Sequence, residues 1–175
     1  MLQLDPNIDY PRKLESKAII RFQDCDPLKH LNNAKYFDYF FNAREDQVAE
    51  IYGLDPNDYF VHNHTSWVVY NHQIAYMNSA KVSERVDIIS SIVFFNENTK
   101  ITEFIMCDQT KKILKCVLWT TSKYIDTDTG TTTNHQPEIM NYLSRIGVKG
   151  IDMKEVTFAS RLKMIKKELA EGTYI

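Results

Sequence analysis

The chain has 175 residues, of which 43% are hydrophobic and 12% aromatic, and its formal net charge is −2. This length and composition predict a single domain spanning residues 1–175 with a substantial core, and they argue against a disordered chain. The charge gives no indication of nucleic acid or an anionic membrane as a partner. Scattered cysteines, no hydrophobic leader and no long apolar run predict a soluble, cytoplasmic protein without disulfides.

The first third of the sequence predicts an arm, a strand and a long helix. Residues 1–13 are polar and contain prolines, so we expect a lead-in arm. Residues 14–23 alternate in polarity, which is typical of a half-buried strand. Its inner face is expected to carry Leu14, Ser16, Ala18, Ile20 and Phe22. Apolar side chains then recur at helical spacing as far as Gly53, which predicts a buried helix of about 20 residues.

The rest of the chain predicts a loop at residues 55–65, a meander of strands and two closing helices. The strands are expected at 66–77, 84–96, 100–108 and 113–126. A helix is predicted at 137–147, and a C-terminal extension, 152–175, contains an amphipathic helix. The polar, solvent-facing side of that helix is expected to carry Arg161, Lys163, Lys166 and Lys167. This order predicts an α+β protein whose curved antiparallel sheet wraps around a long central helix.

Residues 24–36 (DCDPLKHLNNAKY) place acids, a histidine and two asparagines between the predicted strand and helix. A helix N-terminus presents unpaired N–H groups and partial positive charge, which polarise a carbonyl or stabilise an oxyanion. Asp26 and His30 lie just upstream as a base or nucleophile and a proton carrier. The pattern therefore indicates acyl transfer or hydrolysis. In the alternative interpretation, Asp24, Asp26 and Asn32 only cap turns, and His30 fills a gap.

The motif D-x-D-x-x-x-H-x-N-N-x-x-Y, followed by a helix containing NARE, resembles the hot-dog-fold thioesterases. It is similar to the 4-hydroxybenzoyl-CoA and acyl-CoA thioesterase group, and HLNNAKY is also similar to acyl-ACP thioesterases. The resemblance covers residues 14–145. It implies a hot-dog fold and hydrolysis of an acyl thioester of CoA or of acyl carrier protein in fatty acid metabolism, with no cofactor.

The resemblance assigns roles by position. Asp26 matches the catalytic carboxylate of the family, and His30 matches the histidine near the thioester. Asn33 occupies the position whose backbone N–H meets the thioester carbonyl, and Asn32 is expected to order the loop or the water.

Two departures from the family pattern narrow the expected mechanism. Lys29 stands where many acyl-CoA members have glycine, and Leu28 stands where acyl-ACP members carry a second polar catalytic residue. Both departures favour hydrolysis led by the Asp26 carboxylate, and they leave open whether it acts as a base or as a nucleophile.

The resemblance also implies an acyl tunnel along the central helix and a homodimer or homotetramer. Aromatic residues that suit an acyl chain or an aryl group are expected to line the substrate site: Tyr36, Phe37, Phe40, Phe41 and Tyr76. Family members join two sheets edge to edge with the active site in the seam, so a second copy is expected to complete the site. Lys81, Arg85 and Lys100 are candidates for contact with the phosphates of CoA.

Four other interpretations, two of possible sites and two of the function, are weaker. The HNH sequence at 62–64 lacks nearby acids or cysteines, so no metal site is expected. Cys25 has aspartates on both sides that disfavour its thiolate, so we expect a packed small residue rather than a nucleophile. The alternative function is a hot-dog module that binds or senses acyl-CoA without turnover, which loss of Asp26 would not affect. A hydratase or dehydratase is a third interpretation, and the sequence contains none of its motifs.

Overall fold

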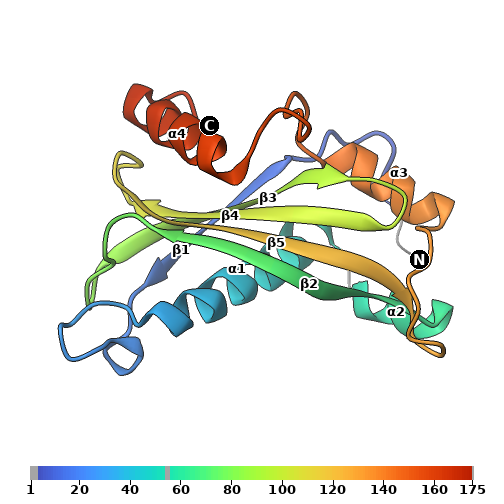
Figure 1. Cartoon of the computed structure of the whole chain (residues 1–175), viewed down its shortest axis with the longest axis horizontal. Helices are drawn as coiled ribbons and strands as arrows, with labels where there is room; N and C mark the ends of the chain where they lie inside the picture. The colour runs from blue at the N-terminus through green and yellow to red at the C-terminus, as the bar shows by residue number, and fades with distance from the viewer. Residues whose placement is uncertain (1–3, 54–55, 175) are drawn as a thin grey trace.

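The computed structural model describes residues 4–53 and 56–174, with the side chains of all of these except 56–58. Five strands form one antiparallel sheet in the order β1-β3-β4-β5-β2, so β1 and β2 are its edges (Figure 1). The strands are β1 (Lys13–Ile19), β2 (Thr65–Tyr76), β3 (Arg85–Phe95), β4 (Thr99–Asp108) and β5 (Leu114–Asp126). The predicted α+β class and the meander are therefore confirmed.

The long helix α1 (Tyr36–Tyr52) covers one face of the sheet, which we call the inner face. A 3-10 turn, Asn33–Lys35, leads into the helix. The helix ends at Gly53, whose φ of 63° and N–H bond to the Ala49 carbonyl (3.1 Å) form a left-handed cap. Register shifts in β2 and β3 mark bulges, which bend and twist strands, and the sheet curves around α1 as predicted.

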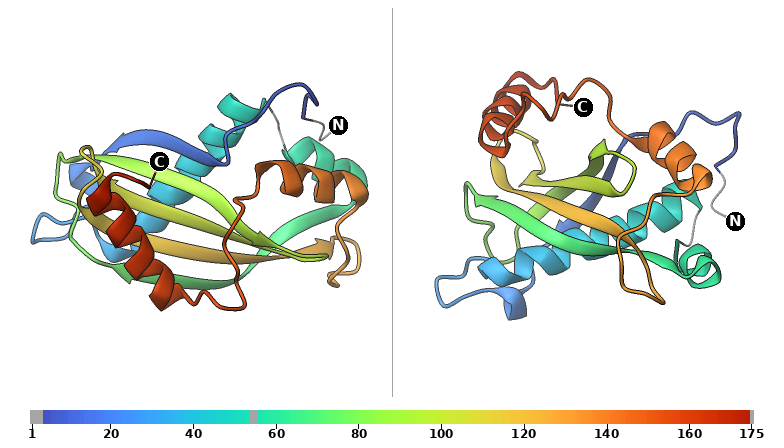
Figure 2. Two further views of the ribbon diagram at one scale, coloured as in Figure 1. Left: turned by 90° about the horizontal axis from the view of Figure 1, so that it is seen from above. Right: turned by 45° about the vertical axis from the view of Figure 1, so that its right-hand side comes forward.

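The helix α4 (Phe158–Glu171) covers the opposite, outer face of the sheet (Figures 1 and 2). Its buried residues Ile165 and Leu169 pack against apolar side chains of the central strands. These are Ile89, Ile105, Cys107, Leu114 and Val117. The predicted amphipathic C-terminal helix is therefore confirmed.

The predicted position of Arg161 on the solvent side of α4 is wrong. Arg161 is only 4% exposed, and its guanidinium donates two hydrogen bonds to the Glu103 carboxylate of β4, at 3.0 and 2.9 Å. The amphipathic pattern counts every charged residue as exposed. An arginine can nevertheless be buried when a carboxylate lies opposite it, because two N–H···O bonds then compensate part of the lost hydration.

Two shorter helices, α2 (Pro56–Asn63) and α3 (Pro137–Ile146), lie at the end of the molecule where α1 finishes (Figure 1). The predicted helix at 137–147 is confirmed, but the prediction of a plain loop at 55–65 is wrong. A proline at the first helical position suits a helix start, because it lacks the N–H that would stay unpaired there. Tyr59 of α2 is 6% exposed and belongs to the core that α3 closes.

The first strand is shorter than predicted. Leu14 and Ile20 are 0% and 1% exposed, as expected for its inner face. The strand ends at Ile19, however, and Phe22 starts a 3-10 turn with 82% of its surface exposed. Phe22 therefore lies outside the core, because the chain leaves the sheet before the alternation in sequence ends. None of the helices in the described part is long and apolar enough to cross a membrane.

Candidate active site

The loop before α1 is closed by the side chain and backbone of Asp26. Its Oδ1 accepts hydrogen bonds from the backbone N–H groups of Leu28 (2.9 Å) and His30 (3.0 Å). Its own N–H donates to the His30 carbonyl at 2.8 Å, and Lys29 adopts a φ of 62° inside the loop. Within the described chain, Oδ2 of Asp26 forms no hydrogen bond. One oxygen therefore holds the loop, and the other stays available to a ligand.

The start of the helical segment lies beside this loop. Oδ1 of Asn32 accepts a hydrogen bond from the Ala34 N–H at 3.0 Å, so Asn32 caps the 3-10 turn as its sequence position indicates. The Asn32 N–H donates to the Asp24 carbonyl (2.9 Å), which joins the loop to the turn. The Tyr76 hydroxyl donates to the Asn33 carbonyl at 3.0 Å. The Asn33 N–H forms no hydrogen bond with any residue that the structure describes.

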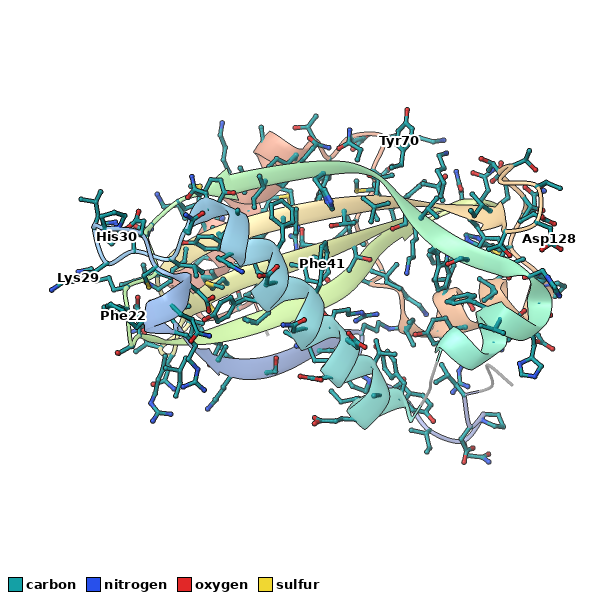
Figure 3. The ribbon with its side chains drawn as sticks, turned by 90° about the horizontal axis from the view of Figure 1, so that it is seen from below. Phe22, Lys29, His30, Phe41, Tyr70 and Asp128 are labelled. Carbon is teal, nitrogen blue, oxygen red and sulfur yellow. The ribbon has the colours of Figure 1, made fainter. Side chains whose placement is uncertain are left out.

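The structure thus brings Asp26, His30, Asn32 and Asn33 into one loop at one end of the molecule. Figure 3 shows His30 and Lys29 there, with Asp128 at the opposite end. His30 is partly buried and pairs through its backbone with Lys81. Its imidazole ring forms no hydrogen bond with the described residues.

The predicted substrate-binding residues fall into two groups. Tyr36 is buried, accepts a hydrogen bond from the Ala80 N–H (3.2 Å) and packs edge-on against Tyr76. Phe40 has no exposed surface. Tyr36 and Phe40 therefore belong to the core behind the loop. Phe37 is only partly buried, and Tyr76 is 42% exposed, so both keep surface that solvent can reach.

His72 of β2 lies beside the predicted substrate-binding residues, although the sequence analysis did not predict a role for it. Its ring lies 5.0 Å from that of Phe37 and 6.0 Å from that of Phe41, and its Nδ1 is 3.1 Å from the Thr120 hydroxyl. Burial lowers the pKa of His72, so the ring is neutral near pH 7. The bulge in β2 changes which residues face inward, and the alternation in the sequence therefore did not mark this one.

Two polar neighbours of Asp26 have structural roles. Oδ2 of Asp24 accepts a hydrogen bond from the Tyr39 hydroxyl at 2.9 Å, which ties the loop to α1. Partial burial, followed by the charges of Asp24 and Asp26, raises the pKa of the Cys25 thiol. A thiol with a raised pKa is a poor nucleophile at neutral pH.

The three cations proposed for CoA phosphates do not share a surface. Lys81 lies beside His30, Arg85 lines a groove along the β1 side of α1, and Lys100 lies beneath the far half of α1.

The HNH sequence at 62–64 was considered as a metal site. The ring of its second histidine, His64, pairs with Asp128 at 3.1 Å. The described side chains include no group of three or more histidine, cysteine or acidic residues placed to bind a metal ion.

Known structures share this architecture. The chain is similar to the probable thioesterase YbaW from Escherichia coli, at 21% identity and a TM-score of 0.68, over 77% of this chain and 99% of that one. It is also similar to the 12:0-ACP thioesterase from Umbellularia californica, at 12% identity and a TM-score of 0.71, over 83% of this chain and 55% of that one. A third similar structure is a Staphylococcus aureus protein in complex with CoA, at 8% identity and a TM-score of 0.69, over 87% of this chain and 98% of that one. The α+β layout is therefore the hot-dog fold that these structures share.

A family model identifies the chain more closely than the fold does. The model of the thioesterase-like superfamily matches residues 20–156, from the end of β1 to just before α4. The chain belongs to this superfamily, as the motif at 24–36 predicted. No curated protein matches the sequence. Membership supports hydrolysis of a thioester as the class of reaction, and α4 lies outside the matched region.

Proposed function

We propose that the chain hydrolyses an acyl thioester of coenzyme A to a free carboxylic acid and a thiol, with Asp26 as the catalytic carboxylate. The observation that carries this proposal is the unequal use of the two Asp26 oxygens. Backbone N–H groups hold Oδ1, whereas Oδ2 forms no hydrogen bond with the described residues. A carboxylate fixed in this way suits general-base or nucleophilic catalysis, because its free oxygen does not have to be ordered during the reaction.

The proposed mechanism uses the start of the helical segment to stabilise charge. Asp26 takes a proton from water, which attacks the carbonyl carbon, or it attacks that carbon directly and forms an acyl anhydride that water hydrolyses once the thiol has left. The Asn33 N–H, unpaired in the described chain, donates to the oxyanion that forms. The C–S bond then breaks, and His30 provides the proton for the departing thiolate. Asn32 holds the turn through its bond to the Ala34 N–H.

The proposal includes a homodimer that joins two sheets through β2. The strand is an edge of the sheet, and its residues Val69 and Tyr70 are 54% and 72% exposed. Figure 3 shows Tyr70 projecting from this edge. A long exposed edge strand with apolar side chains is a surface for pairing with another strand. The outer face is covered by α4, so a tetramer formed through that face would have to displace this helix.

Coenzyme A is proposed as the thiol partner because one similar structure contains it, although another similar protein acts on an acyl carrier protein thioester. Both thiols end in the same reacting group. The reaction at Asp26 is therefore the same for either partner.

The test measures free-thiol release from a panel of short, medium, long and aromatic acyl-CoAs. Asp26→Asn should reduce turnover by about 100-fold or more, the scale of losing an acid–base group. Asp38→Asn is the matched control, because Asp38 is an exposed residue of α1 that pairs only with Lys35 in the described chain. Unchanged turnover in Asp26→Asn would overturn the assignment. Binding of acyl-CoA without turnover in either protein would identify a binding module.

A further inference from the structure

A chamber of about 430 Å3 lies between the inner face of the sheet and the C-terminal half of α1. Its walls are aromatic and come from several elements: Phe41, Phe60, Trp67, Phe104 and Tyr142. Hydroxyl groups of the two central strands β4 and β5 line its floor, namely those of Thr102, Thr120 and Ser122. This size and mixture are typical of a site for a small organic group.

Two cationic side chains enter this chamber, Arg44 from α1 and Lys100 from β4. The Lys100 ammonium lies 3.6 Å from the centroid of the Trp67 ring. Arg44 donates a hydrogen bond to the Ser90 hydroxyl at 3.1 Å, and its guanidinium lies 6.0 Å from the centroid of the Tyr52 ring. Neither cation forms a salt bridge with any carboxylate among the described side chains. Glu45 of α1 also lines the chamber and contributes one negative charge, so positive charge is in excess between the aromatic walls.

This arrangement is costly without a ligand. Burial lowers the pKa of Lys100 to about 7, and the charge of Arg44 acts in the same direction. Both cations are partly buried, and a cation that loses part of its hydration is costly unless a negative group compensates it. The Trp67 ring is itself held in place, since its N–H donates to Nε2 of His135 at 2.9 Å. The aromatic face opposite Lys100 is therefore fixed.

An aromatic path connects the chamber with the proposed active site. Phe37, near the start of α1, packs on His72, and His72 packs on Phe41, which lines the chamber. Arg44 lies eight residues beyond Tyr36, which is about 12 Å along a helix axis. An acyl group whose carbonyl lies near the helix start would therefore place its distal end within reach of the chamber.

We propose that the chamber selects the acyl group, and that the substrate is a thioester whose acyl moiety ends in a carboxylate. The proposal rests on the function proposed above. Arg44 supplies a planar fork of N–H donors that matches a carboxylate, and Lys100 supplies a point charge on the opposite wall. The aromatic walls contact the chain or ring that joins the carboxylate to the thioester.

The test compares acyl-CoAs that differ only in the terminal group. Adipoyl-, suberoyl- and sebacoyl-CoA are paired with hexanoyl-, octanoyl- and decanoyl-CoA, and 4-carboxybenzoyl-CoA is paired with benzoyl-CoA. The natural protein should show a kcat/KM at least about tenfold higher for the carboxylate member of the best pair, the scale of one charge-assisted hydrogen bond. Lys100→Met and Arg44→Gln should each reduce this ratio by about tenfold.

The matched control is Lys123→Met, which removes a lysine bound to the Thr99 hydroxyl outside the chamber. This change should leave the ratio unaltered. A ratio of one or below in the natural protein overturns the proposal, whether or not the variants fold. The proposal is also overturned if Lys100→Met lowers kcat/KM equally for both members of a pair. That result assigns the cation to the phosphates of CoA, which both members share.

The design separates this inference from the proposed function. If no acyl-CoA is hydrolysed, the hydrolase assignment fails, and calorimetric affinities for suberoyl- and octanoyl-CoA then decide the inference with the same expected ratio. If all acyl-CoAs are hydrolysed with equal efficiency, the hydrolase assignment stands and the carboxylate preference fails.

Discussion

The outer face of the sheet holds a buried cation, whereas the inner face holds two that are partly buried. On the outer face, Arg161 meets the Glu103 carboxylate, which also accepts hydrogen bonds from Trp119 (2.8 Å) and Tyr174 (3.4 Å). On the inner face, Arg44 and Lys100 line a chamber with no described ion pair. Charge is thus paired and packed where α4 closes the sheet. It is left unpaired where we propose that a ligand enters.

Replacing Glu103 should produce the largest effect on stability. In Glu103→Gln, the guanidinium of Arg161 stays buried without its counter-charge, and the free energy of unfolding should fall by about 3–5 kcal/mol. Urea denaturation monitored by tryptophan fluorescence measures this change. Glu168→Gln is the control, because Glu168 reaches Arg161 at 3.4 Å with a side chain that is 30% exposed. The control should cost less than about 1 kcal/mol, and a similarly small cost for Glu103→Gln would contradict the comparison.

Replacing Lys100 should change the free energy of unfolding in the opposite direction and by a smaller amount. Lys100→Met removes an unpaired cation and keeps an unbranched side chain, so the free energy of unfolding at pH 7 should rise by about 1 kcal/mol. Lys123→Met should give no gain, because it removes a lysine with a hydrogen-bonded partner. A loss of stability in Lys100→Met would mean that the contact with the Trp67 ring outweighs the cost of desolvating the charge.

These contrasts show what the sequence can and cannot predict. Alternating and helical patterns located the strands, α1 and α4, because local periodicity reflects which face of an element is buried. The same patterns placed Arg161 in solvent, because its partner Glu103 lies on a strand far away in the sequence. Periodicity reports exposure only on average, and it contains no information about pairing between distant segments.

The same distinction holds for the candidate site, where one part was predicted from the sequence and the other was not. Asp26, His30, Asn32 and Asn33 were predicted together because all of them belong to one continuous motif. The chamber was not predicted, since its residues come from α1, α2, α3 and four strands. Lys100 was grouped with Lys81 and Arg85 by charge alone. Only the register of β4 shows that Lys100 faces inward alongside Thr102 and Phe104.

The effect of Lys100 should depend on pH in a defined direction. Its pKa is about 7 in the folded protein and 10.5 for an ordinary lysine, so between these values the unfolded chain binds a proton that the folded chain does not. Stability should therefore rise with pH across this window, and the advantage of Lys100→Met should shrink. Unfolding curves of both proteins at pH 7, 8 and 9 measure the difference, in which the titration of groups common to the two proteins cancels. A constant difference would show that Lys100 keeps an ordinary pKa.

The smallest effect is expected where a charge pair is neither buried nor functional. Lys35 and Asp38 form a salt bridge at 2.8 Å with side chains that are 45% and 54% exposed. Water screens such a pair, and a lysine beside a helix N-terminus is opposed by the helix dipole. Lys35→Met should therefore leave the midpoint of urea unfolding unchanged within error, at low and at high salt. If it shifts the midpoint as much as Glu103→Gln does, then the presence of a salt bridge, rather than its burial, determines stability here, and the contrast between the two faces would lose its physical basis.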